Sequence, residues 1–365
     1  MKKLFCLVWV SFLVCTASLH AFTIKATYDS SVTSLTNAAQ IESAFAAAVA
    51  TFQSLYTNNA TINITVYWGP GGPFTNGINL SRSFLTVFGT SYPQITNALF
   101  MSRASAADTN SVASLPATDP TGGGPWWMPR AQIKVLGLPI SGVSPNDSVN
   151  DGAVGFTSNA VYALDPANRA VAGEYDFIGA AQHEISEVLG RITLGLQTNV
   201  GFLPFDLFRF TNNAARSFDP NANNAYFSVD NGATALNFYY TNANLGDIQD
   251  WKSGITPDAY DAFVPEGVVL PISTVDIATL DVLGYNGPGL AAPRLAAGKL
   301  SNGSFQIGFV GTPGTMFTVL ASTNLTLPTS NWAIVGTATE GAPGQFQFID
   351  SSPAASQRFY QVRSQ

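Results

Sequence analysis

The chain has 365 residues, with 16 Lys and Arg against 23 Asp and Glu, so its formal net charge is −7. An acidic protein without a basic cluster is a poor partner for nucleic acid or for an anionic membrane surface, and we exclude both classes. The charged fraction is only 11%. Together with abundant Asn, Ser, Thr and Gly, that low fraction favours an extracellular or periplasmic protein.

Residues 1–21 have the layout of a secretory signal peptide. Two lysines precede an apolar run from Leu4 to Cys15, and the small residue Ala21 closes the segment. The run is too short for a lone membrane span, although an N-terminal membrane anchor is the alternative. Both cysteines of the chain, Cys6 and Cys15, lie in this segment. The secreted chain would therefore have no disulfide. Removal of the two lysines would give it a formal charge of 14 − 23 = −9. We expect no membrane span after residue 21.

Apolar periodicity predicts a strand, a helix and a strand at the start of the mature chain. Residues 22–29 and 60–68 alternate as strands do, and the second run is closed by Gly-Pro-Gly-Gly-Pro at 69–73. Between them, apolar residues recur every three or four positions, at Ile41, Phe45, Ala48, Phe52 and Leu55. The order indicates a mixed sheet with a helix on one face. Further along we expect a helix over 94–107, a loop at Trp126–Trp127, a short helix over 130–136 and strand character over 151–165. We also expect a helix over about 177–189, with Asp176 as its N-cap and Gly190 as its C-terminal stop.

The composition shifts to Gly, Pro and Ala after Tyr-Asn-Gly-Pro-Gly at 285–289. We therefore expect a main domain over 22–287, a linker over 288–300 and a C-terminal domain over 301–365. Turn residues separate the strand-like runs of that last domain, which are Phe305–Val310, Phe317–Ser322, Trp332–Thr337, Gln345–Ile349 and Phe359–Val362. This pattern predicts a small antiparallel β-sandwich, and the predicted fold class of the whole chain is α+β.

The stretch from His183 to Arg191, His-Glu-Ile-Ser-Glu-Val-Leu-Gly-Arg, carries the most chemical information. Because the only other histidine, His20, lies in the predicted signal peptide, any metal site here must be rich in carboxylates. On a helix, His183 and Glu187 are one turn apart and project together, with Glu184 beside them. That arrangement suits two metal ligands and a carboxylate that holds a water molecule. The alternative is a surface histidine and a solvated carboxylate on an ordinary amphipathic helix.

Three segments follow this helix in order: Asp-Leu-Phe-Arg-Phe at 206–210, Gly-Asp-Ile-Gln-Asp-Trp-Lys at 246–252 and Asp-Ile-Ala-Thr-Leu-Asp-Val-Leu-Gly-Tyr at 276–285. With the His-Glu-x-x-Glu-x-x-Gly spacing at 183–190, they resemble the metzincin-like secreted bacterial metalloproteases over about residues 22–287. Those proteins have a His-Glu-x-x-His-x-x-Gly helix, an Asp-Leu-Phe-Arg segment, a Ser-His-Trp-Lys segment and a closing Leu-Asp-x-x-Gly-Tyr. The resemblance implies a zinc-peptidase domain with a mixed twisted sheet and an active-site helix.

The resemblance also implies a role for each site residue. His183 is the first metal ligand, Glu184 is the general base, and Glu187 takes the place of the second ligand. Asp250 stands where the family has a histidine and is the candidate third ligand, with Asp206 in reserve, whose alternative role is a helix or strand cap. The ion we expect is zinc, although one nitrogen and two oxygens also admit manganese, iron or calcium. Two carboxylates in place of histidines would weaken the Lewis acidity of the ion.

Two further residues, Tyr226 and Arg209, are candidates for assisting an oxyanion. Their alternative roles are structural, because Tyr226 lies in a segment typical of a core strand and Arg209 could pair with a carboxylate. No methionine follows the helix before Met316, so the methionine turn typical of metzincins is missing.

The expected function is that of a secreted, monomeric, metal-dependent endopeptidase that acts on a protein or peptide substrate. The alternative is a catalytically inactive metalloprotease-like protein that binds a surface or matrix. A third reading is glycan binding by the aromatic residues of the C-terminal sandwich, which are otherwise expected in its core: Trp332, Phe346, Phe348, Phe359 and Tyr360. The C-terminal segment resembles the small terminal sandwich of secreted proteins from environmental Gram-negative bacteria, which implies an extracellular or cell-surface location.

Overall fold

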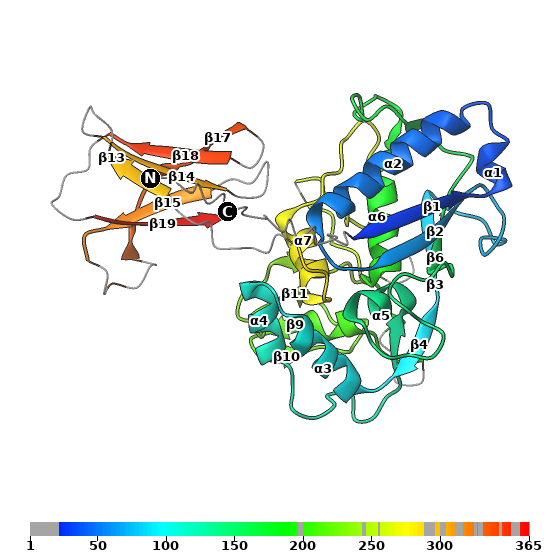
Figure 1. Cartoon of the computed structure of the whole chain (residues 1–365), viewed down its shortest axis with the longest axis horizontal. Coiled ribbons are helices and arrows are strands. Elements are labelled where there is room, and N and C mark those ends of the chain that lie inside the picture. Colours follow the sequence, from blue (N-terminus) through cyan, green and yellow to red (C-terminus); the bar gives the residue numbers. More distant parts are fainter. Residues whose placement is uncertain are drawn as a thin grey trace, which may run out of the picture.

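The computed structural model describes residues 22–195, 200–242, 246–254, 256–287, 296–299, 304–310, 317–324, 327, 331–342, 345–351 and 358–364. The predicted signal peptide therefore lies outside the described residues, as does most of the predicted linker. The described part is a mixed fold of helices and several sheets, so the predicted α+β class is confirmed (Figure 1).

The first 287 residues contain, in chain order, β1 (Thr23–Tyr28), α1 (Ser30–Thr33), α2 (Ala38–Leu55), β2 (Thr61–Trp68), β3 (Ser81–Leu85), β4 (Val87–Thr90), α3 (Tyr92–Ser102), α4 (Ala106–Ala113), β5 (Trp126–Pro129), α5 (Arg130–Leu136), β6 (Gly152–Phe156), β7 (Tyr162–Ala163), β8 (Tyr175–Asp176), α6 (Phe177–Leu189), the 3₁₀ helix η1 (Pro204–Phe208), β9 (Arg209–Asn212), β10 (Ala215–Arg216), β11 (Tyr226–Phe227), β12 (Asn237–Phe238) and α7 (Thr274–Val282). The strand, helix and strand expected at the start are β1, α2 and β2. The predicted bounds of α5 and α6 are confirmed as well.

The central sheet has the strand order β1-β2-β6-β3. Its first three strands are parallel, and β3 pairs antiparallel with β6 at the edge. Helix α6 packs against α2, β3 and β6. Gly152 on β6 permits this close approach, since a Cβ there would lie 2.7 Å from both Val188 Cγ1 and the Phe84 carbonyl oxygen. The sheet and α2 thus hold α6 in the middle of the molecule.

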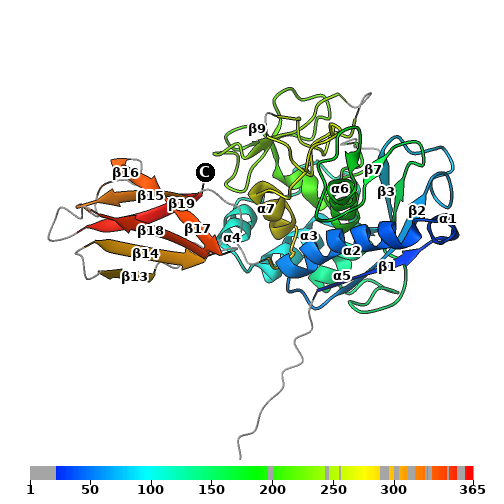
Figure 2. The ribbon, with the colours of Figure 1, turned by 90° about the horizontal axis from the view of Figure 1, so that it is seen from above.

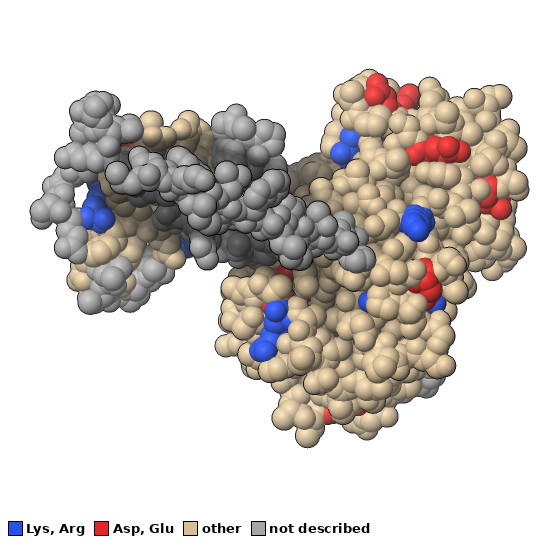
Figure 3. Space-filling model, viewed as in Figure 1, with Lys and Arg blue, Asp and Glu red and all other residues tan. Residues whose placement is uncertain are grey.

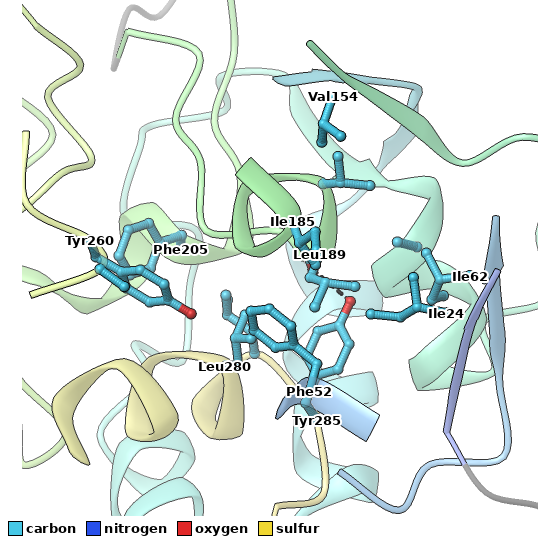
Figure 4. Packing of buried hydrophobic residues seen from close by; sticks show 14 of the residues in the cluster. Ile24, Phe52, Ile62, Val154, Ile185, Leu189, Phe205, Tyr260, Leu280 and Tyr285 are labelled. Carbon is cyan, nitrogen blue, oxygen red and sulfur yellow. Dashed lines mark hydrogen bonds between the residues drawn. The ribbon is translucent and has the colours of Figure 1, made fainter. Parts of the chain in front are cut away.

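One hydrophobic core surrounds α6. The apolar stripe of α6 consists of Ile178, Ala181, Ile185 and Val188, which recur at helical spacing. All four residues are buried. Figure 4 shows Ile185 and Leu189 packed beside residues from the sheet, α2 and the region of α7, among them Ile24, Ile62, Phe52, Leu280 and Tyr285. The Tyr285 hydroxyl donates a hydrogen bond of 2.6 Å to the Leu189 carbonyl and so ties the segment after α7 to the end of α6.

The predicted single helix over 94–107 is wrong, because the chain forms two helices, α3 and α4. Ser105 begins the second one, where its side chain accepts from the Asp108 backbone N–H and the Asp108 side chain accepts from the Ser105 backbone N–H. Such a reciprocal cap starts a new helix and breaks the old one.

Two other expectations also need correction. Trp126 and Trp127 do not lie in an irregular loop, since they belong to β5, which pairs with β4. Strand character over 151–165 is interrupted: β6 ends at Phe156 and β7 begins at Tyr162. Val161, inside the range expected to be strand, is 61% exposed because it lies in the connection between them.

The C-terminal strands form two antiparallel sheets, visible as two layers in Figure 2. One sheet has the order β13-β14-β18-β17 and the other β16-β15-β19. The strands are β13 (Ala296–Lys299), β14 (Phe305–Val310), β15 (Phe317–Ser322), β16 (Ala333–Thr337), β17 (Thr339–Ala342), β18 (Gln345–Asp350) and β19 (Phe359–Ser364). Phe309 and Phe346 of the first sheet pack with Phe317 and Val319 of the second, which is the core of a sandwich. Residues 296–299 lie within the predicted linker, but they form β13 and pair with β14 in the first of these sheets.

The aromatic residues named for glycan binding contribute to packing. Trp332 and Phe346 are buried, and the Trp332 indole nitrogen donates to the Leu327 carbonyl. Phe348 and Tyr360 pack against the sandwich core. The structure thus uses most of these rings as core residues.

Charged side chains are sparse on the face shown in Figure 3, where Lys and Arg lie singly or in small groups among Asp and Glu. Within the described part of the chain, no helix has both the length and the apolar character needed to cross a membrane.

Candidate metal centre

Three predicted ligands converge at one point. His183 Nε2 lies 3.3 Å from Asp250 Oδ1 and 3.6 Å from Glu187 Oε1. One potential ligand atom of each of the three residues lies within 4.8 Å of the others. Bonds of about 2.0–2.2 Å to a tetrahedral ion would place ligand atoms about 3.3–3.6 Å apart. Both His183 distances match that spacing.

The imidazole of His183 is held in the orientation that a metal ligand needs. Its Nδ1 lies 2.9 Å from the Ala259 carbonyl oxygen. Because a carbonyl oxygen can only accept, Nδ1 carries the proton and Nε2 faces the two carboxylates. Burial acts to lower the pKa of His183, but the charge of Asp250 and hydrogen bonds to Asp250 and Glu187 outweigh it and raise this pKa well above its usual value.

Among the three candidate ligands, Glu187 accepts hydrogen bonds from two further side chains. The Ser83 hydroxyl of β3 donates to Oε2 over 2.7 Å, and the Gln249 amide donates to Oε1 over 2.9 Å. Burial acts to raise the pKa of Glu187, yet the hydrogen bond from His183 and the charge of Arg191 lower it to about 2. Glu187 is therefore an ionised carboxylate, and since its side chain is only 4% exposed, the alternative of a solvated helix carboxylate is not the one observed.

Arg191 completes the cluster, and its role was missed in the sequence. Its Nη1 lies 2.7 Å from Asp250 Oδ1 and its Nη2 lies 3.5 Å from Glu187 Oε1, while the side chain is 0% exposed. Gly190, with a φ of +124°, ends α6 and turns the chain so that Arg191 folds back beside the last turn. The position of Arg191, four residues after Glu187, was the sequence signal for this contact.

A cleft of about 690 Å³ opens in front of the cluster. His183, Glu184 and Asp250 line it, whereas Glu187 and Arg191 are not among its lining residues. Glu184 is 4% exposed, and its Oε2 has no hydrogen-bond partner among the described residues. Burial, with the charge of Glu187 as the next cause, raises the pKa of Glu184 well above its usual value. The Ser81 side chain hydrogen-bonds this carboxylate, and a buried carboxylate that faces a cleft with one oxygen unpartnered can exchange a proton with a bound molecule.

The loop that carries Asp250 is anchored by its neighbour Trp251, which is fully buried. The Trp251 indole nitrogen donates to Asp276 Oδ1 over 2.8 Å, and its backbone N–H donates to the Tyr260 carbonyl oxygen over 2.8 Å. From the preceding segment, Arg209 Nη1 donates to the Ile248 carbonyl oxygen over 3.1 Å.

These contacts, with the bond from Tyr285 to α6, link all four segments on which the metzincin resemblance was based. The 206–210 segment supports the 246–252 segment through Arg209. That segment is tied to 276–285 through Trp251, and 276–285 returns to α6 through Tyr285. Segments distant in the sequence therefore build one site.

The reserve ligand Asp206 is not part of the cluster. Its Oδ2 accepts from the Leu203 backbone N–H over 2.8 Å at the start of η1, so the alternative role of a cap is the one observed. Burial raises the pKa of Asp206 to about 7. Asp176 stands at the N-cap position of α6 without capping it, because its carboxylate instead pairs with Arg169 and accepts from the Leu270 backbone N–H.

Neither candidate for assisting an oxyanion lines the cleft. The Tyr226 hydroxyl donates to the Gly232 carbonyl from strand β11, so the structural role is observed. Arg209 does not pair with a carboxylate among the described residues. Its guanidinium donates to the Ile248 carbonyl oxygen and lies 4.6 Å from the centre of the Tyr239 ring.

The cluster fits one divalent ion. It offers an imidazole nitrogen of fixed orientation with carboxylate oxygens 3.3 Å and 3.6 Å from it, all three ligand atoms lying within 4.8 Å of one another beside an open cleft. Mixed nitrogen and oxygen donors suit several first-row metals, so the donor set alone does not single out zinc.

Comparisons with family models, with curated proteins and with solved structures found no match. The likeness to metzincin-like metalloproteases thus stays a prediction from the four sequence segments.

Proposed function

We propose that this protein is a secreted, metal-dependent endopeptidase in which His183, Glu187 and Asp250 hold one zinc ion. The observation that carries the proposal is the spacing of the three ligand atoms, with His183 Nε2 at 3.3 Å and 3.6 Å from the two carboxylates, beside a cleft that His183, Asp250 and Glu184 line. When bound, the ion would supply Lewis acidity at the reacting carbonyl.

Glu184 is the general base of the proposed reaction. Its unpartnered Oε2 is free to accept a proton from an attacking water molecule and to pass it to the leaving amine. Burial raises its pKa, which brings the carboxyl closer to the range in which it can both accept and return a proton. Glu184 belongs to the same helix as His183 and Glu187, so rigid backbone holds the base beside the ligands.

The edge of the central sheet supports a peptide as the substrate. Strand β3 is the last strand in the sheet order, and Asn79, Leu80 and Ser81 at its start line the cleft. An edge strand has backbone groups that can pair with an extended chain. A peptide added beside β3 would pass the side of the cleft where Glu184 lies.

Two variants of the secreted protein test this proposal. The wild type is expected to retain about one zinc ion per chain after dialysis and to cleave casein. His183→Ala is expected to lose both properties, whereas Glu184→Gln should keep the ion and lose cleavage. An intact, folded wild type that neither binds an ion nor cleaves casein would rule the proposal out.

The second candidate is the catalytically inactive binding protein, and the Arg191 contacts favour it. The guanidinium already supplies positive charge to Asp250 and Glu187, so the cluster is a satisfied ion network by itself. Under this reading, Glu184→Gln leaves the biological activity of the protein unchanged. Loss of that activity in Glu184→Gln, with metal content retained, would exclude it.

The proposed location depends on residues 1–21. Sequencing the N-terminus of protein recovered from the medium or periplasm of a Gram-negative host should begin at Phe22. A chain that retains Met1 in the membrane fraction would instead support the N-terminal anchor.

A further inference from the structure

We propose that Arg191 is a positioning residue of the metal centre, a built-in cation that keeps the ligand carboxylates assembled before a metal ion arrives. In this role the guanidinium and the ion are partners of the same two carboxylates. The inference rests on the proposed function, because it assigns Arg191 a role toward the ion held by His183, Glu187 and Asp250.

All three nitrogen atoms of the Arg191 guanidinium have oxygen partners. Its Nε donates to the Ser186 hydroxyl over 2.8 Å, Nη1 reaches Asp250 Oδ1 at 2.7 Å, and Nη2 lies 3.5 Å from Glu187. The guanidinium carbon lies 4.3 Å from the centre of the Tyr260 ring, so the aromatic ring covers the group. A guanidinium bonded in this way holds one orientation.

Arg191 also offsets the charge that results from replacing histidine with a carboxylate. Glu187 and Asp250 together carry two negative charges within a few ångströms, and without a cation the buried pair would repel. With the single charge of Arg191, the set has a net charge of −1. That equals the net charge of a site with two neutral histidines and one carboxylate, which is a common zinc set.

The position of Arg191 leaves the ligands open on the cleft side. The guanidinium is fully buried and does not line the cleft, whereas His183 and Asp250 do. A carboxylate oxygen has two lone pairs, so Asp250 Oδ1 can accept from Arg191 and still face His183 Nε2. Arg191 therefore supports Asp250 without filling the space between the three ligands.

A metal ion and Arg191 should consequently be coupled antagonistically. Removing the guanidinium takes away a cation that contacts both buried carboxylates, which destabilises the metal-free protein. A divalent ion restores the missing positive charge. Zinc should therefore stabilise a variant that lacks the guanidinium more than it stabilises the wild type.

The experiment compares the Tm of the secreted protein with chelator and with zinc, in the wild type and in Arg191→Met. We expect the Tm of metal-free Arg191→Met to fall by several degrees, and the upward shift with zinc to be larger in Arg191→Met than in the wild type. Arg191→Lys is the matched control that keeps the charge, and its zinc shift should stay close to that of the wild type. Glu187→Gln combined with Arg191→Met removes one charge of each sign and should recover part of the metal-free Tm.

The outcomes separate the inference about Arg191 from the proposed metal centre. If zinc stabilises the wild type and Arg191→Met equally, the inference is wrong and the proposed metal centre stands. If zinc stabilises Arg191→Met alone, the guanidinium takes the place of an ion in the wild type, and both the proposed metal centre and the positioning role of Arg191 toward an ion are wrong. If zinc stabilises neither protein, both are wrong. Should metal-free Arg191→Met not fold, Arg191→Gln provides the same comparison with a smaller change in side-chain polarity.

Discussion

The indole nitrogen of Trp251 donates to Asp276 Oδ1 over 2.8 Å, and both side chains are fully buried. This bond joins the loop that carries Asp250 to the first turn of α7. Because Trp251 is the neighbour of Asp250, Asp276 supports the position of a candidate ligand without itself lining the cleft.

Replacing Asp276 with Ala should weaken the metal centre and the fold together. The buried indole N–H would lose its acceptor, which costs about 1–3 kcal/mol of the free energy of unfolding. Zinc affinity, measured by competition with a chromogenic chelator, should fall because Asp250 is less firmly held. Ser273→Ala is the control, since it removes the hydroxyl that accepts from the Asp276 backbone N–H and spares the indole bond. Equal zinc affinity in Asp276→Ala and wild type would contradict the role of this bond.

The charge of the cleft predicts a preference among substrates. Its described lining contains five acidic residues and no Lys or Arg: Glu184, Asp247, Asp250, Asp261 and Glu266. We expect higher kcat/KM for peptides with Lys near the cleaved bond than for peptides with Glu there, and a smaller difference at high salt.

Glu266→Gln tests this preference away from the ligands. This change should reduce kcat/KM for the Lys peptide a few-fold. The kcat/KM for a matched peptide with an uncharged residue at that position should stay almost unchanged. Glu42→Gln on α2, which removes the same charge outside the cleft, should change neither value. A preference for acidic peptides would show that the lining charge does not select the substrate.

Asp281 should make the stability of the protein depend on pH. Burial, opposed by the hydrogen bond from Ser105, raises the pKa of Asp281 from 3.8 to about 7. Between these values the folded state holds a proton that the unfolded state has lost. The contribution of Asp281 to stability is therefore most favourable below about pH 4 and is lost as the pH rises through about 7.

Asp281→Asn should remove this dependence, because the amide stays neutral and can still accept from Ser105. Urea denaturation at several pH values should show the variant gaining stability relative to the wild type as the pH rises from 4 to 8. A difference between the two proteins that is constant over this range would show that Asp281 keeps an ordinary pKa.

A buried ion network next to the sheet should be essential for folding. Asp151 is 0% exposed and accepts from Arg130 Nη1 and Lys134 Nζ, both over 2.8 Å. Asp151→Ala would leave two buried cations undercompensated and should cost about 3–5 kcal/mol of the free energy of unfolding. Asp147 contacts the same cations but is 19% exposed, so Asp147→Ala should cost less. Similar midpoints of urea unfolding for the two variants would contradict this ranking.

The local features of the protein could be derived from the sequence alone. The bounds of α6 follow from its apolar stripe and from Gly190, and the common projection of His183 and Glu187 follows from 3.6 residues per turn. The strand, helix and strand at the start follow from periodicity in the same way. These features depend on residues within one or two turns of one another, and spacing along the chain is enough to reveal them.

The tertiary structure decided what these elements contact. Asp250 and Asp206 were both candidate ligands, and only packing separates them: Trp251 anchors the loop of the first beside His183, whereas the second caps η1. Ser83 and Gln249 donate to Glu187 from segments far away in the chain, and no spacing along the sequence predicts such contacts. Glu184 and Glu187 on the polar face of α6 are buried, and β3 packs against this helix. Distance between remote segments is set by the packing of the whole core, which sequence periodicity does not encode.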